Sequence, residues 1–149
     1  MRLSFDTNVL VYAADVSAGA KHARALELLD RAERVDVILV LQSLAEFFHA
    51  TTRRRLLSHD AATQFIVDWS GVYPVIAAAP ADLSGAINAV RQAGLSFWYA
   101  MLWSAANSND CDILLTEDMQ DGRRLGRVQF VNPFDPANAR LVDTILPPD

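Results

Sequence analysis

The 149-residue sequence contains a single cysteine, Cys111, and no long uninterrupted hydrophobic segment. One cysteine cannot form a disulfide within the chain, which favours a reducing compartment, and we expect a cytoplasmic protein. No apolar segment reaches the roughly 18 residues that a transmembrane helix needs. The N-terminus lacks the charged, apolar and small-residue layout of a signal peptide. The sequence therefore predicts a protein with no association with a membrane.

Positive charge is also scarce, because the formal net charge is −5. This excludes a protein that binds nucleic acid through bulk charge alone. It does not exclude a nuclease, because a carboxylate-lined site contributes negative charge and bound metal ions reverse its local sign. Hydrophobic residues make up 52% of the sequence, which indicates a folded domain of ordinary core size.

Several common catalytic motifs are missing. The sequence has no glycine-rich phosphate-binding loop and no serine–histidine arrangement around a nucleophile elbow. The three histidines, His22, His49 and His59, show no metal-ligand spacing with one another or with Cys111. A zinc site is therefore not expected, and we expect surface or partly buried histidines. His49 lies one helical turn beyond Glu46 and could border a cleft there.

Short hydrophobic segments alternate with amphipathic segments along the chain. The predicted strands are residues 2–6, 37–41, 72–77, 112–116 and 128–131. The predicted helices are residues 9–14, 20–34, 42–55, 61–69, 80–93 and 97–107. We expect Gly71 to end the fourth helix, and Pro74 to place the third strand at an edge. The alternation indicates one α/β domain over residues 1–149 with a mostly parallel sheet, followed by a loose tail from about residue 135.

Acidic residues follow two of the predicted strands and begin the helix after another. Asp6 ends the first strand, Glu46 lies near the start of the helix after the second, and Glu117, Asp118 and Asp121 follow residues 112–116. Parallel strands bring their carboxyl ends to one edge of a sheet, so these groups can converge. Clustered carboxylates repel one another unless a cation lies among them. Oxygen ligands alone suit Mg²⁺ or Mn²⁺.

Each of these acids also has a structural interpretation. Asp6 can cap the turn after the first strand. Ser43 and Glu46 have the spacing of a capping box, in which the Glu side chain bonds back to the cap residue. The three acids after residue 116 can form an ordinary solvated turn. It is their joint placement at strand ends that favours a functional role.

Four segments together resemble the PIN-domain family, and within it the VapC-like ribonuclease toxins of toxin–antitoxin pairs. Residues 5–12 (FDTNVLVY) are similar to the opening motif of the family, and residues 42–48 (QSLAEFF) to its second motif. Residues 114–122 (LLTEDMQDG) are similar to the last acidic motif, and residues 131–134 (VNPF) to an ending found in one subgroup. Each motif is weak alone, but the order and spacing are specific and cover nearly the whole chain.

The resemblance implies a PIN-like three-layer α/β/α domain with a central, mostly parallel sheet. It implies a metal-dependent endoribonuclease toxin that hydrolyses RNA with Mg²⁺ or Mn²⁺. It assigns metal binding to Asp6, Glu46 and Asp118, assistance to Asp121 and Glu117, and support to Thr7 and Asn8, with Asn8 orienting Asp6 or a water. The implied partners are an RNA substrate, a cognate antitoxin over or near the cleft, and a second copy of the chain in a homodimer.

The third motif of the family departs from the pattern at Tyr99. The family carries Asp at this position, near a helix N-terminus that Ser96 would cap here. A phenol is neutral at pH 7 and is a poor Mg²⁺ ligand, so we expect weak metal binding and slow or absent RNA cleavage. Tyr99 is either an inactivating change or the mark of a natural member with altered activity. The competing hypothesis is an inactive PIN scaffold that binds RNA or a protein without cleavage.

Two further interpretations stay open. Trp98 and Trp103 belong to a strongly apolar helix at residues 97–106. Core packing is the expectation for both, although a helix that is apolar all round also suits a dimer surface. A phosphate-receiver domain likewise has acids at strand ends. Such domains usually place two acids after the first strand, where this sequence has only Asp6.

Overall fold

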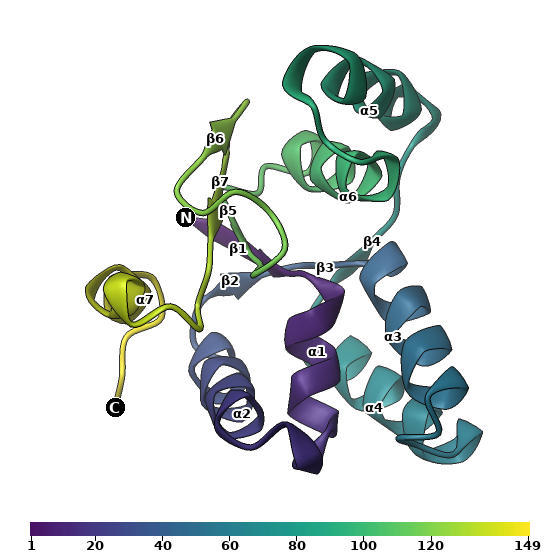
Figure 1. The fold of residues 1–149 in the computed structure, drawn as a ribbon, viewed down its shortest axis with the longest axis vertical. Helices are drawn as coiled ribbons and strands as arrows, with labels where there is room; N and C mark the ends of the chain where they lie inside the picture. Colours follow the sequence, from purple (N-terminus) through teal and green to yellow (C-terminus); the bar gives the residue numbers. More distant parts are fainter.

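The computed structural model describes residues 1–149 and contains a central five-stranded sheet (Figure 1). Its strands lie in the order β2-β1-β5-β7-β6, and all neighbouring pairs are parallel except β6 with β7. The strands are β1 (Arg2–Phe5), β2 (Asp36–Val37), β5 (Ile113–Leu115), β6 (Arg124–Leu125) and β7 (Val128–Val131). A second, parallel sheet of two strands pairs β3 (Leu39–Val40) with β4 (Val75–Ile76).

Helices cover both faces of the central sheet. The α-helices are α1 (Thr7–Ala14), α2 (Ala20–Ala32), α3 (Leu41–Arg53), α4 (His59–Val72), α5 (Pro80–Ala93), α6 (Phe97–Ser108) and α7 (Ala139–Ile145). Helices α5 and α6 lie together on one side, and α1 and α2 lie on the other with α3 and α4 beside α1 (Figure 1). No helix has the length and apolar character needed to span a membrane.

The alternating side chains of the central strands explain the three layers. In β5, Ile113 and Leu115 belong to a buried cluster with residues of α1 and α2. Leu114, between them, belongs to a second cluster with Leu102 of α6. Because successive side chains of a strand point to opposite faces, both faces of β5 are buried. The predicted α/β/α architecture with a mostly parallel sheet is confirmed.

The segment predicted as one buried strand, residues 37–41, divides between the two sheets. Val37 pairs with β1 of the central sheet, whereas Leu39 pairs with β4 of the small sheet. The change of partner falls at Ile38, whose amide still donates to the carbonyl of Leu3 at 3.0 Å. Hydrophobicity predicted the burial of residues 37–40 correctly, whereas Leu41 is exposed and begins α3. The pattern carries no information about which neighbour each residue pairs with.

Two other predicted boundaries were wrong. Gly71 does not end the fourth helix, because α4 continues through it to Val72. An isolated glycine lowers the stability of a helix by only about 1 kcal/mol, and α4 is anchored by the buried side chains of Ala62 and Trp69. Residues 117–126, where no strand was predicted, contain the short strand β6.

The C-terminal segment is not a loose tail. Pro136–Asn138 form a 3-10 turn, and α7 follows it with Val142 and Ile145 buried. Leu146 is fully buried, and its carbonyl accepts a hydrogen bond from the Arg31 guanidinium at 3.2 Å. These contacts dock the segment against α2, so the prediction of a loose tail from about residue 135 was wrong.

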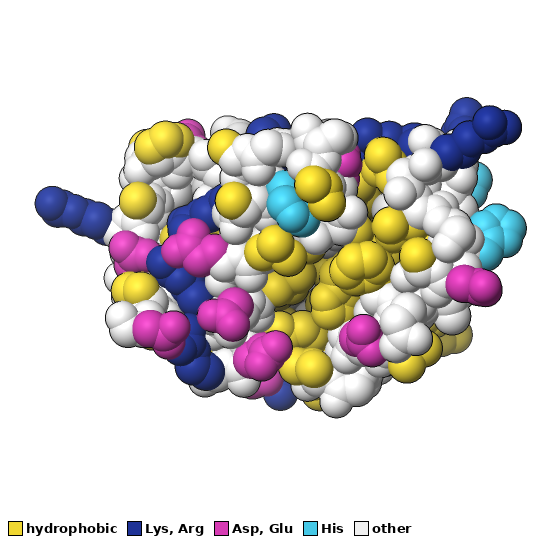
Figure 2. Space-filling model, turned by 90° about the horizontal axis from the view of Figure 1, so that it is seen from below, with side chains coloured by type: hydrophobic (Ala, Val, Ile, Leu, Met, Phe, Trp, Pro, Cys, Tyr) yellow, Lys and Arg dark blue, Asp and Glu magenta, His cyan; other side chains and the backbone are white.

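One end of the molecule carries an apolar hollow. Figure 2 shows the end toward which α1, α2 and α4 extend, where hydrophobic side chains gather in a depression. Acidic and basic side chains lie beside it (Figure 2). Those of the predicted acidic residues that converge lie at a different place, the carboxyl ends of β1 and β5.

Candidate functional site

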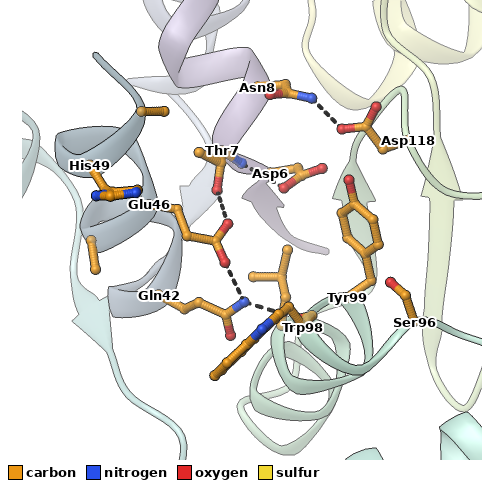
Figure 3. Close-up of a pocket in the computed structure, with 13 residues that line it drawn as sticks. Asp6, Thr7, Asn8, Gln42, Glu46, His49, Ser96, Trp98, Tyr99 and Asp118 are labelled. Carbon is orange, nitrogen blue, oxygen red and sulfur yellow. Dashed lines mark hydrogen bonds between the residues drawn. The ribbon is translucent and has the colours of Figure 1, made fainter. Parts of the chain in front are cut away.

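A pocket of about 740 Å³ lies where β1 and β5 end, between α3 and α6. Three carboxylates line it, and no lysine or arginine does. Its lining residues are Asp6, Thr7, Asn8, Gln42, Ala45, Glu46, His49, Ala50, Ser96, Trp98, Tyr99, Leu102 and Asp118. Figure 3 shows the three acids approaching from separate elements. The structure therefore brings together Asp6, Glu46 and Asp118, as the sequence predicted.

Asp6 is the residue between β1 and α1, and it is almost completely buried at 2% exposure. Its carboxylate accepts hydrogen bonds from the Thr7 amide at 2.6 Å and the Thr116 hydroxyl at 2.8 Å. Burial raises the pKa of Asp6 from 3.8 to about 6, and the negative charges of Asp118 and Glu46 add to the rise, although the two hydrogen bonds oppose it. Asp6 thus serves both as the predicted helix cap and as a wall of the pocket.

Neutral donors hold the Glu46 carboxylate in place. One oxygen accepts from the Thr7 hydroxyl at 2.8 Å, and the other accepts from the Gln42 amide at 2.8 Å. The same Gln42 amide donates to the backbone carbonyl of Trp98 at 2.9 Å, which ties α3 to the start of α6 (Figure 3). Because neither donor is charged, the negative charge of Glu46 is left uncompensated by its partners.

The capping-box interpretation of Glu46 was wrong. Helix α3 begins at Leu41, with Val40 as its cap, so Ser43 already lies inside the helix. The buried Ser43 hydroxyl donates instead to the carbonyl of Phe5 at 3.2 Å. The strand β3 runs directly into α3 and starts the helix three residues earlier than a Ser43 cap would, which frees Glu46 to face the pocket.

Asp118 is held by two neighbours. Its backbone amide donates to the Thr116 hydroxyl oxygen at 3.1 Å, and the side-chain amide of Asn8 donates to its carboxylate. Asn8 therefore contacts Asp118 and not Asp6, one of the two groups that it was predicted to orient. Thr116 hydrogen-bonds both Asp6 and Asp118 through one hydroxyl. Sequence analysis did not single out Thr116, although it follows a buried strand as Asp6 does.

Two predicted site residues lie outside the pocket. The Asp121 carboxylate accepts from the backbone amide of Asn132 at 2.7 Å and from an amide side chain of the turn before α7. The Glu117 carboxylate accepts from Lys21 at 2.7 Å and from the Tyr12 hydroxyl. Both acids fix the surrounding segments, and the structure does not bring them to Asp6.

Tyr99 stands in the first turn of α6, as predicted, and its ring points toward Asp6 and Asp118 (Figure 3). Burial raises the pKa of the Tyr99 phenol above its usual range, and the negative charges of Asp118 and Asp6 raise it further. The phenol therefore stays protonated and neutral at physiological pH. Ser96 is the cap residue of α6, but its side chain makes no capping hydrogen bond.

The donor set fits an oxygen-preferring divalent cation in chemistry and charge. Three carboxylates share the pocket, and the side-chain hydrogen bonds to Asp6 and Glu46 come from neutral groups only. The structure contains no group of three or more His, Cys, Asp or Glu side chains arranged to hold a metal ion. Mg²⁺ keeps several waters and commonly uses one or two carboxylates. Asp6 and Asp118, joined through Thr116, fit such a hydrated ion.

Three other residues, Trp98, His49 and Gln42, also line the pocket. Trp98, expected in the core, is 64% exposed at the edge of the pocket. His49 borders the pocket, the alternative that its spacing from Glu46 allowed. Gln42 lines it through an amide that the second motif contained without an assigned role. Side-chain exposure at a helix start depends on tertiary neighbours, which local sequence does not reveal.

No protein-family model matches the sequence, and no curated protein sequence matches it either. Solved structures do match. VapC20 of Mycobacterium tuberculosis, a sarcin–ricin-loop-cleaving toxin, has a TM-score of 0.65 at 18% identity over 78% of this chain and 89% of its own. A chain of VapBC2 from Rickettsia felis, bound to a promoter DNA fragment, has a TM-score of 0.64 at 13% identity over 87% and 97%.

A chain of a toxin–antitoxin complex from Klebsiella pneumoniae has a TM-score of 0.64 at 17% identity, over 89% of this chain and 98% of its own. These likenesses extend over most of both chains in each pair, although few residues are identical. They confirm at the level of fold the resemblance that the four sequence motifs indicated. The chain has the PIN-like α/β/α fold of the VapC toxins.

Proposed function

We propose that this chain is a metal-dependent endoribonuclease toxin of the VapC type, with its catalytic site in the acidic pocket. One observation carries the proposal: Asp6, Glu46 and Asp118 converge from three separate elements on a pocket without lysine or arginine. The shared fold supports the same function, because VapC20 is a toxin that cleaves the sarcin–ricin loop.

Mg²⁺ or Mn²⁺ would be held by Asp6 and Asp118, with Glu46 binding directly or through water. Such an ion polarises a phosphate and lowers the pKa of a bound water, which supplies hydrolysis without a protein nucleophile. The neutral donors around the pocket keep the three carboxylates in fixed positions. Thr116 sets Asp6 relative to Asp118, and Thr7 fixes Glu46.

In this proposal, Tyr99 weakens metal binding and RNA cleavage at the site. Its neutral phenol lies beside two acids, at the position where the third motif of the family carries a metal-binding carboxylate. The helix N-terminus at this position favours a negative charge, and the phenol does not provide one. We therefore propose weak metal affinity and slow or absent cleavage for the chain with Tyr99.

The test compares the wild type with Tyr99→Asp and, as a matched control, Tyr99→Phe. Metal binding is measured by calorimetric titration with Mn²⁺, and cleavage is measured on a structured RNA. Tyr99→Asp should raise both metal affinity and cleavage rate, whereas Tyr99→Phe should raise neither. The inference about Tyr99 fails if the wild type cleaves RNA, in a metal-dependent way, as fast as Tyr99→Asp.

The second candidate function is a PIN scaffold that binds RNA or a protein without cleavage. The phenol of Tyr99 inside the acid pocket favours it, because a carboxylate is missing there. Absence of cleavage by both the wild type and Tyr99→Asp, together with retained RNA or protein binding, would select this function.

We also propose a cognate antitoxin and a homodimer as partners. Two of the matching structures are of a VapBC pair and a toxin–antitoxin complex. A basic or apolar antitoxin segment would suit the acid pocket and block it. Co-purification with the product of a neighbouring antitoxin gene, and the mass of the purified chain in solution, test these two partners.

A further inference from the structure

Helix α6 begins with two aromatic side chains on the protein surface. Trp98 is 64% exposed and Phe97 is 39% exposed. Their rings meet edge to face with centroids 4.9 Å apart. Trp98 also lines the acidic pocket, so this apolar surface is continuous with the candidate catalytic site. Large aromatic side chains left exposed at a pocket are typical of ligand contact.

The position of Trp98 is tied to that of a candidate catalytic acid. Gln42 donates one hydrogen bond to the Trp98 carbonyl at 2.9 Å and another to the Glu46 carboxylate at 2.8 Å. In Figure 3 the indole extends beside Gln42, at the opposite side of the pocket from Asp118. The backbone that carries the indole is therefore anchored, as a binding platform requires.

The charge of the molecule decides what kind of contact can hold a nucleic acid here. The chain carries a formal charge of −5, and the pocket has no lysine or arginine to contact phosphates. Single-stranded nucleic acids are held by phosphate contacts and by base stacking on aromatic side chains. Because no lysine or arginine supplies the first contribution at this site, base stacking has to supply most of the affinity of the metal-free protein.

We propose that Trp98 is a stacking platform for an unpaired nucleobase of the RNA substrate, next to the phosphate to be cleaved. The inference rests on the proposed ribonuclease function and adds the subsite that binds the substrate. A base has an apolar face that covers the indole and a polar edge that neutral groups recognise. Ser96 and Gln42 offer such groups at the pocket.

The test measures binding of a fluorescein-labelled, six-nucleotide single-stranded RNA by anisotropy, in EDTA so that cleavage is absent. The variants are Trp98→Ala, Trp98→Phe and the matched control Leu83→Ala, which removes a 45% exposed apolar side chain of α5 outside the pocket. Trp98→Ala should weaken binding by about 5- to 100-fold. Trp98→Phe keeps an aromatic face and should stay within about threefold.

Three checks accompany the titration. Leu83→Ala should bind as the wild type does. Affinity should fall by less than about tenfold between 50 and 200 mM salt, in contrast to the steep loss seen when many phosphates are bound. Thermal unfolding of each variant is recorded by circular dichroism. Because Trp98 is exposed, its substitution should leave the unfolding temperature unchanged.

The stacking proposal is overturned if Trp98→Ala binds RNA like the wild type, or if the wild type binds no RNA. It is also overturned if Trp98→Ala converts a dimer into a monomer while RNA affinity stays the same, because the indole would then belong to a protein interface. Binding that depends on Trp98, with no cleavage in Mn²⁺ even in the Tyr99→Asp background, would reject the ribonuclease and keep the subsite. Cleavage that is unchanged in Trp98→Ala would reject the subsite and keep the ribonuclease.

Discussion

At the scale of single residues, hydrogen bonding explains which acids reach the pocket. Asp6 and Asp118 share the Thr116 hydroxyl, and Glu46 is held by Thr7. Asp121, by contrast, is fully engaged by donors near the C-terminus. An acid that receives backbone and amide donors elsewhere has no reason to turn toward the pocket, so position in a motif does not by itself assign a role.

The raised pKa of Asp6 predicts how the stability of the metal-free protein depends on pH. The folded pKa is about 6, above the value of 3.8 for the unfolded chain. The folded state therefore binds the proton more tightly, and the contribution of Asp6 to stability is fully present below pH 3.8 and is lost as pH rises through about 6. The ionised state costs about 3 kcal/mol, from roughly two pKa units.

Urea unfolding in EDTA between pH 4 and 7 checks this for the wild type and Asp6→Asn. The stability of the variant relative to the wild type should increase across this range. A difference between the two proteins that does not change with pH would contradict the burial of an ionisable Asp6.

The bridging role of Thr116 gives a second prediction. Thr116→Val keeps the side-chain shape but removes the hydroxyl, so the buried Asp6 carboxylate loses a donor and the Asp118 amide loses an acceptor. We expect a loss of about 1–3 kcal/mol of stability, and weaker Mn²⁺ binding in the Tyr99→Asp background. Thr116→Ser, which keeps the hydroxyl, should restore the metal affinity. Failure of Ser to differ from Val would show that the hydroxyl is not needed.

At the scale of elements, hydrophobic patterning located most strands and helices. The segments at β1, β5 and β7 were recognisable because both of their faces are buried. The division of residues 37–41 between two sheets was not, because pairing partners come from distant strands. The C-terminal helix was missed because the prolines and polar residues around it resemble a linker.

The docking of the C-terminal segment leads to a third prediction. Leu146 is fully buried and Arg31 bonds both its carbonyl and the Asp143 side chain. Leu146→Ala should cost about 2–5 kcal/mol, as for other buried leucines. Leu141→Ala, at a 36% exposed position of α7, the helix that precedes Leu146, is the matched control and should cost much less. Chemical denaturation measures both, and equal losses would mean that α7 does not pack as described.

The true start of α3 gives a fourth prediction. The Ser43 hydroxyl donates to the Phe5 carbonyl and so links α3 to the strand that precedes Asp6. Ser43→Ala should destabilise the fold by about 1 kcal/mol, and Ser43→Gly should be worse, because glycine is unfavourable inside a helix. In a capping box glycine would be tolerated better than alanine. The order of the two variants in urea unfolding therefore separates the two arrangements.

At the scale of the whole molecule, strand order places the acids. Because β1 lies beside β5 with Phe5 opposite Leu115, the residues that follow, Asp6 and Thr116, become neighbours. The pocket is completed by α3 and α6, which contribute Glu46 and Tyr99. The site therefore depends on the assembled sheet and helices, and no single segment contains it.

A bound ion should stabilise the assembled molecule. Binding to the folded state alone adds RT ln(1 + [L]/Kd), about 2.7 kcal/mol at a ligand concentration of 100 Kd. At pH 7, Mn²⁺ should raise the unfolding temperature of Tyr99→Asp more than that of the wild type, and should leave Asp6→Asn unchanged. Differential scanning fluorimetry at several Mn²⁺ concentrations measures this. Equal shifts in all three proteins would place the ion outside the pocket.

The sequence alone determined the alternation of strands and helices, and with it the sheet edge where Asp6, Glu46 and Asp118 meet. It also placed Tyr99 where the resemblance to the PIN-domain family implies a carboxylate. These features depend on local hydrophobicity and residue identity. Tertiary structure alone decided that Glu117 and Asp121 turn away and that Trp98 is exposed. The reason is physical: a side chain turns toward the donors, acceptors and apolar surface that distant segments bring beside it.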